Sequence, residues 1–123
     1  MTTMIRDKDG VIAAVPSTKP SDRHFRNAWV FDSAQTAITE DITEAKVIFK
    51  DKIREVRGPL LEAEDVVYMK ALEANDSDAK VASVAKKVAL RDAPAASAIS
   101  SADTIDKLKA AWDEDVLGTS PYK

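Results

Sequence analysis

The feature that most constrains this fold is a change in the spacing of apolar residues at Asp41. From there they recur at helical spacing in two parallel rows: Ile42, Phe49, Val56 and Ala63, and Ile53, Leu60 and Val67. Because a helix has about 3.6 residues per turn, both rows lie on one face. The pattern predicts a long amphipathic helix, with Asp41 or Thr43 accepting hydrogen bonds from its first amides.

The Gly58-Pro59 pair interrupts this helical pattern. A proline in a helix interior lacks a backbone donor and clashes with the preceding turn, at a cost of about 3 kcal/mol. The apolar rows nevertheless keep their phase across the pair. We therefore expect a kink or a one-residue break, with the helix resuming at Leu60 and running to about Ala74.

Two shorter helices are expected after a turn at residues 75–78. The first carries an apolar face and ends before Pro94, because a residue that precedes proline is disfavoured in the α region; this face consists of Val81, Val84, Ala85 and Val88. Small residues make a linker over 93–101. Ser101, Asp103 or Thr104 then caps a helix that bears Ile105, Leu108 and Trp112 and ends at Gly118.

The first forty residues have the alternating pattern of strands. Residues 5–6 and 11–15 predict a short hairpin around Gly10, and Pro16 and Pro20 bracket an extended linker. A strand is expected at 28–31 and a weaker one at 36–39. The prediction is an α+β, mainly α fold: a short N-terminal β-hairpin and small sheet, then a long kinked amphipathic helix and two shorter helices. It forms one structural domain, with a small β region at 1–40, a helical region at 41–118 and a mobile tail at 119–123.

The composition offers little from which to build a catalytic or metal site. The 123 residues include one histidine, three glycines and no cysteine. Asp7-Lys8-Asp9-Gly10 begins like a calcium loop but lacks the later ligands, so a plain turn is favoured. His24 is expected to be structural, and the carboxylate pairs lie in strongly polar runs. We expect no enzyme activity, no metal, no cofactor and no small-molecule substrate.

The charge balance also limits the partners. A net charge of −3 gives no overall attraction for polyanions, which argues against nucleic acid and anionic membranes. The N-terminus lacks the pattern of a signal peptide and no stretch has the length of a membrane span. These features favour the cytosol of the producing cell.

Two groups of apolar residues are candidate partner-binding sites. In the first, Arg23 and Arg26 alternate with aromatic residues that could stack on single-stranded nucleic acid, although burial in the core is the stronger interpretation; these aromatic residues are Phe25, Trp29 and Phe31. The second belongs to the C-terminal part, where the helices alone make a thin core; it consists of Trp112, Val116, Leu117 and Tyr122. Another protein or an ordinary intramolecular core could cover this second group, and the sequence favours neither.

Residues 52–94 carry a resemblance to a known family. Lys52-Ile53-Arg54, Arg57, Leu60-Leu61 and Asp65 are followed by the run Lys87-Val88-Ala89-Leu90-Arg91-Asp92-Ala93-Pro94. This order resembles the tail assembly chaperone or tail fibre assembly proteins of bacteriophages, over about residues 22–112. The run from Ala89 to Pro94 is its most specific part. Where commoner members have an Asp-Trp-Thr-Gln stretch after the Leu-Leu pair, this chain has Asp65-Val66-Val67-Tyr68-Met69.

The resemblance implies a protein that binds without catalysis. It would engage a phage tail fibre or another tail protein in the host cytoplasm during assembly, and be released or retained in the virion tail. Trimeric fibres expose strand edges and apolar faces before they assemble, and the surfaces near Trp29 and Trp112 are expected to cover them. One alternative is a purely structural tail, baseplate or capsid adaptor. A weaker one is a small nucleic-acid-binding regulatory protein.

Overall fold

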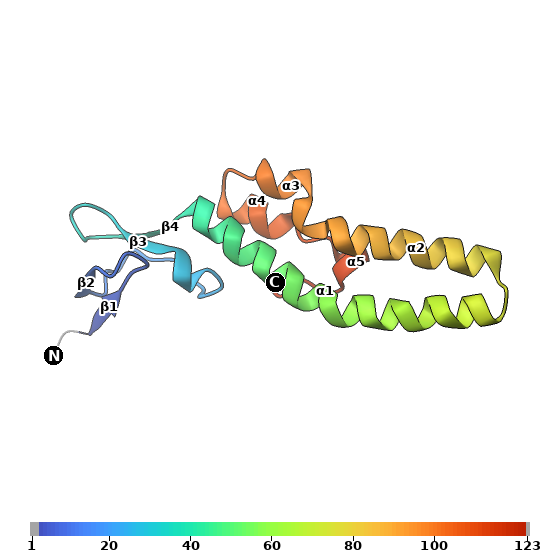
Figure 1. Ribbon diagram of the computed structural model, residues 1–123. Coiled ribbons are helices and arrows are strands. Elements are labelled where there is room, and N and C mark those ends of the chain that lie inside the picture. The colour runs from blue at the N-terminus through green and yellow to red at the C-terminus, as the bar shows by residue number, and fades with distance from the viewer. Residues whose placement is uncertain (1–2, 123) are drawn as a thin grey trace.

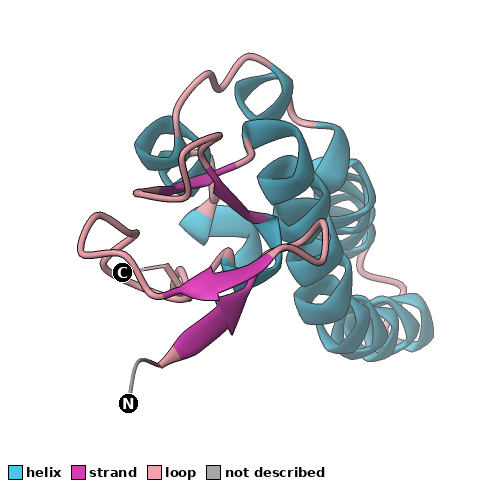
Figure 2. Cartoon of the chain, turned by 90° about the vertical axis from the view of Figure 1, so that its left-hand side faces the viewer, coloured by secondary structure: helices cyan, strands magenta, loops and turns pink. Residues whose placement is uncertain are grey.

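A computed structural model describes residues 3–122. Two small antiparallel sheets form at one end of the molecule (Figures 1 and 2). Strands β1 (Met4–Arg6) and β2 (Ile12–Ala14) pair with Ile5 opposite Ala13, and β3 (Trp29–Phe31) and β4 (Ile38–Glu40) pair with Val30 opposite Thr39. Gly10 has φ +85°, a conformation that glycine adopts readily. The predicted hairpin and both predicted strands are confirmed.

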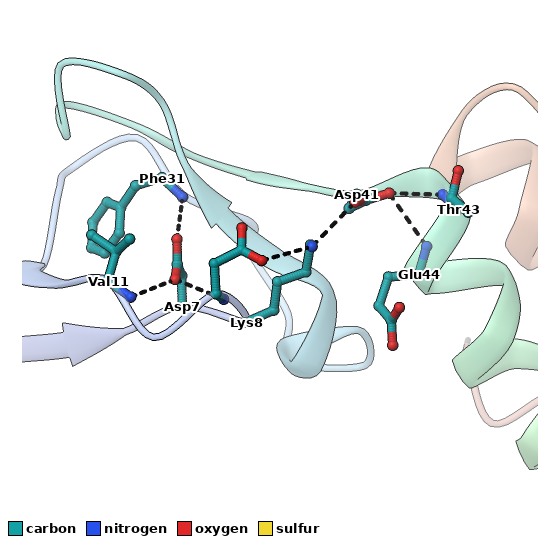
Figure 3. A network of polar contacts seen from close by, with 8 residues as sticks. Asp7, Lys8, Val11, Phe31, Asp41, Thr43 and Glu44 are labelled. Atoms are coloured by element: carbon teal, nitrogen blue, oxygen red, sulfur yellow. Dashed lines mark hydrogen bonds and ion pairs between the residues drawn. The ribbon is translucent and has the colours of Figure 1, made fainter.

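A buried carboxylate joins the two sheets (Figure 3). Asp7 is 7% exposed, and its side chain accepts hydrogen bonds from the backbone N–H groups of Asp9, Val11 and Phe31. The ammonium group of Lys8 lies 3.1 Å from Asp9 Oδ1 and 3.5 Å from Asp41 Oδ2. Since Asp41 caps the following helix, this network ties the hairpin to β3 and to the start of the helical region.

Helix α1 (Ile42–Glu73) is 32 residues long and contains Pro59. Asp41 Oδ1 accepts hydrogen bonds from the N–H groups of Thr43 and Glu44, so the predicted cap is confirmed. The alternative of a break at Gly58-Pro59 is wrong, because helical backbone continues through the pair. A change of direction in the middle of α1 is visible in Figure 1, as expected where proline crowds the preceding turn.

Helix α2 (Ser77–Asp92) runs back along α1, with Asp76 as its N-cap. The predicted linker over 93–101 is wrong, because it contains the 3₁₀ turn η2 (Ala93–Ala95) and the short helix α3 (Ser97–Ser100). The predicted third helix is also wrong as one piece, since it divides into α4 (Ile105–Ala110) and α5 (Glu114–Leu117). Asp113 causes the division, because its carboxylate accepts from the N–H of Asp115 and starts a new helix.

The main core lies between the first half of α1 and the elements that surround it. Phe25 and Ala28 contact this face of α1 from one side; Ala28 belongs to the 3₁₀ turn η1 (Arg26–Ala28), and Phe25 directly precedes that turn. The C-terminal helices contact the same face from the other side. The buried members are Phe25, Ala28, Ala45, Phe49, Ile53, Leu90, Ile99, Ala102, Leu108, Trp112 and Leu117. A smaller cluster of Trp29, Phe31 and Ile38 lies within the sheets. The fold is therefore α+β and mainly α.

The C-terminal segment packs against this core through Tyr122, and residue 123 lies outside the described residues. The expected mobility of residues 119–123 stays a prediction. The ring of Tyr122 stacks on Phe25 and Phe49, with ring centroids 5.2 and 5.3 Å apart. It also meets Trp112 edge to face at 5.9 Å. The aromatic side chain holds the tail although the segment has no helical period.

Candidate protein-binding surface

The distal half of the α1–α2 pair projects beyond the rest of the molecule. In Figure 1 the strands lie beyond the start of α1 and the short helices α3 and α4 lie beside its first half, whereas the second half of α1 has α2 beside it and ends in the connecting turn. Residues 57–88 of this projection are called the distal hairpin below. Its contacts differ in kind from those of the core.

Small and polar side chains line the interface between the two helices of the distal hairpin. Ala71 and Ser83 are buried, and Ser83 Oγ donates a hydrogen bond to the backbone oxygen of Glu64 at 3.3 Å. The ammonium of Lys87 lies 4.7 Å from the ring centroid of Tyr68 and 2.6 Å from Asp65 Oδ1. This seam lets the helices approach closely but buries little large apolar surface.

Eight large apolar side chains of the distal hairpin remain exposed, each between 37% and 71%. They are Leu60, Val66, Val67, Met69, Leu72, Val81, Val84 and Val88. They are called the hairpin surface below. Burial of apolar area contributes roughly 25 cal/mol per Å², so covering these side chains with a partner would contribute favourable binding free energy.

The apolar face predicted for α2 is part of this surface. Val81, Val84 and Val88 are spaced three and four residues apart and are 71%, 48% and 46% exposed. The row that contains Ser83, Lys87 and Leu90 meets α1 instead. An apolar stripe at this spacing is the usual face by which a helix packs against another helix.

A groove runs along one side of the hairpin where α5 meets it. Two adjoining hollows of about 260 and 470 Å³ share Ala89 and Val116 as lining residues. The smaller one is also lined by Leu60 and Ala63, and the larger one by Leu117. The groove therefore extends the apolar surface from the hairpin to the base of the helical region.

The residues predicted to bind a partner are mostly internal. Phe25, Trp29, Phe31, Trp112 and Leu117 are 0–8% exposed, and Val116 and Tyr122 are partly buried. These side chains do not form an exposed docking surface in this structure, because the rings pack on one another and Trp29 lies beneath two arginines. Their role in partner binding stays a prediction. The structure brings Val116 and Leu117 to the edge of the groove, and this is the part of the set that borders accessible apolar surface.

Sequence reasoning missed the hairpin surface as a site. The signal was present: both apolar rows of α1 continue past Pro59, and α2 carries a valine face of its own. The short C-terminal helices pack on the first half of α1 and leave these rows uncovered beyond Val56. An apolar helix face that is longer than the neighbouring elements can cover is the sequence pattern that indicates such an exposed surface.

Comparison with known proteins gives no further guide to this surface. No family model, curated protein or solved structure matches the chain. The described residues contain no cluster of three or more histidine, aspartate or glutamate side chains fit to hold a metal ion. Among the helices of residues 3–122, none combines the length and the apolar character that crossing a membrane requires.

Proposed function

We propose that this protein acts by binding another protein through the hairpin surface, without catalysis. The observation that carries the proposal is the exposure of eight large apolar side chains on two helices whose mutual interface contains small and polar side chains. Within this set, Val81, Val84 and Val88 form one exposed stripe along α2, on the side of that helix away from the row that meets α1. A helix or strand with an apolar face would bury this stripe on binding.

The partner we propose is a bacteriophage tail fibre. The protein would bind the fibre in the host cytoplasm during assembly and would then be retained in the tail or released. This part rests on the resemblance of residues 52–94, above all the run from Ala89 to Pro94. In the structure that run closes α2 and enters η2, and Leu90 and Pro94 are buried there. The run therefore supports the base of the hairpin, and the residues free to touch the fibre lie farther out.

The test is co-expression of this protein with the tail-fibre protein of the same phage. The double variant Val81→Lys, Val84→Lys places two charges on the hairpin surface. The fibre is expected to be soluble and trimeric with the wild-type protein and to lose both properties with the variant. Because both sites are exposed, thermal stability should change little, by about 0.5 kcal/mol or less per site.

Val47→Lys is a matched control. Val47 and Val84 are each 48% exposed and both lie on helices, but Val47 is on the first half of α1, outside the distal hairpin. The control should behave as wild type. Fibre that is equally soluble and trimeric without this protein would exclude the assembly role, and fixed copy number in purified virions with no effect on the fibre would indicate a structural tail component instead.

A further inference from the structure

Four cationic side chains surround a hollow next to the β1–β2 hairpin. The hollow has a volume of about 380 Å³, and its charged lining consists of Arg6, Lys19, Arg23 and Arg26. None of these four side chains forms an ion pair with a carboxylate of residues 3–122. Like charges gathered without a counter-charge repel one another, so an anion placed among them would stabilise the arrangement.

The carboxylates that neighbour these residues in the sequence are already engaged. Asp7 accepts three backbone hydrogen bonds, and Asp22 lies 2.6 Å from the ammonium of Lys109. Asp9 and Asp41 flank the ammonium of Lys8, and Figure 3 shows Lys8 beside Asp41. None of these carboxylates lines the hollow, whose charged residues are all cationic, whereas Asp7 and Glu44 line the hollow beside it.

The side chain of a buried tryptophan also lines this hollow. Trp29 is 2% exposed, and its indole Nε1 has no hydrogen-bond partner among the described residues. The guanidinium groups of Arg26 and Arg23 lie 4.8 and 5.6 Å from its ring centroid. Two of the four cations therefore lie over the ring of a side chain that lines the hollow, so the indole N–H of Trp29 is a nearby reporter for an anion bound there.

We propose that this hollow binds a phosphate group. Guanidinium and ammonium groups are donors only, and four such side chains around one hollow suit a tetrahedral dianion with several acceptor oxygens. One of the guanidinium groups, that of Arg26, also donates to the backbone oxygen of Arg6. The adjoining hollow of about 660 Å³ shares Arg6 and Arg26 with the first and leaves room for a group attached to the phosphate. The site does not depend on the hairpin surface, and it gives Arg23 and Arg26 a local role despite the net charge of −3.

The two tryptophans allow a direct test by nuclear magnetic resonance. Each gives one indole N–H signal, and Trp112 is an internal reference because its Nε1 already donates to the backbone oxygen of Gly118 at 3.0 Å. Inorganic phosphate is titrated against sodium chloride of equal ionic strength. The Trp29 signal is expected to shift saturably with phosphate and not with chloride, while the Trp112 signal stays in place.

The double variant Lys19→Gln, Arg23→Gln removes two of the four charges at exposed positions. It should weaken phosphate binding about tenfold or more, the effect expected from losing charge-assisted hydrogen bonds. Lys70→Gln with Arg91→Gln is the control, since it changes the same residue types at exposed positions on the α1–α2 pair. The control should bind phosphate like wild type.

A third titration separates the sources of the phosphate. Tighter binding of a nucleoside 5′-monophosphate than of inorganic phosphate would identify a phosphate carried on a larger molecule, and equal binding would identify the free ion. The proposal is overturned if the Trp29 signal does not saturate, if acetate shifts it equally, or if both indole signals move together.

Discussion

The side chain of Tyr122 decides whether the last residues of the chain belong to the fold. Burial raises the pKa of its phenol to about 12, and the negative charge of Glu55 acts in the same direction. An unfolded phenol ionises near pH ~10. The unfolded chain therefore loses this proton first, and the folded state loses stability as the pH rises from about 10 towards 12.

This predicts a late titration of Tyr122. The measurement is the ultraviolet absorbance of tyrosinate in the wild-type protein minus that in Tyr122→Phe, with circular dichroism at each pH to verify that the protein is folded. The difference curve should still be near zero at about pH 10.5. A midpoint close to 10 in the folded protein would show that the ring is solvated and the tail loose.

A second prediction concerns Glu40, the last residue of β4. Burial raises the pKa of its carboxyl, as do the carboxylates of Asp22 and Asp106, while the ammonium of Lys109 opposes them. Its Oε2 is buried without a hydrogen-bond partner. Glu40→Gln should raise the melting temperature at pH ~7 by on the order of 3 °C. The gain should vanish below about pH 4, where the carboxyl is neutral in both states.

Asp32→Asn provides the opposite case. Hydrogen bonds from Thr36 hold the pKa of Asp32 below its ordinary value, so its ionised form stabilises the folded state above the unfolded pKa and the benefit disappears as the pH falls. The asparagine variant should melt lower than wild type at pH ~7.

Glu40→Gln melting at or below the wild-type temperature at that pH would show that the buried carboxylate finds a partner in solution.

Individual side-chain roles could be predicted only in part from the sequence. The aromatic residues from Phe25 to Phe31 were favoured as core, and all three are buried. Tyr122 could not be placed, because a segment without a period gives no indication of which face meets the protein. Trp29 was assigned to the core without any sign of its unpartnered N–H, which depends on the positions of atoms far apart in the chain.

At the scale of the elements, α1 contains a glycine, Gly58, whose backbone φ is one that other residues also adopt. Gly58 lies inside the helix, its φ is not positive, and a methyl group built there would meet no atom within 4 Å outside its two chain neighbours and the adjacent backbone of the helix. Gly58→Ala should stabilise the protein by less than about 1 kcal/mol, because alanine loses less conformational entropy in a helix but its Cβ is crowded by the ring of Pro59. Chemical denaturation measures this change.

Gly10→Ala is the matching case at a turn. Gly10 has φ +85°, and a methyl group there would lie 3.4 Å from the guanidinium of Arg6. The same substitution should destabilise the protein by about 1 kcal/mol. If Gly58→Ala also destabilised it, the bend near Pro59 would need the freedom of glycine.

The extent of the long helix was predicted well, and its surroundings were not. The period and the Asp41 cap are local, so they can be read from neighbouring residues. The side of α2 that meets α1 is set by the close approach of the two helices at Ala71 and Ser83. Choosing the side with the most apolar residues would select the valine face instead, which is exposed. Small residues at a helix interface carry little hydrophobic signal although they decide the packing.

The molecule as a whole divides into a packed body and a projecting pair of helices. The body buries aromatic and aliphatic side chains from β3 to α5, whereas the distal hairpin buries Ala71 and Ser83. Local stability follows buried apolar contacts. The two halves of one continuous helix should therefore open with different free energies.

Hydrogen exchange followed by mass spectrometry tests this division. Backbone amides of residues 60–72 and 81–88 should exchange about tenfold or more faster than those of residues 45–53, because the distal pair can open without disrupting the core. A bound partner that covers the hairpin surface should slow the faster group selectively, while Val81→Lys, Val84→Lys removes that slowing. Equal protection along the whole of α1 would mean that the hairpin opens only with the body, and its exposed side chains would then be held rigidly in the geometry that a partner meets.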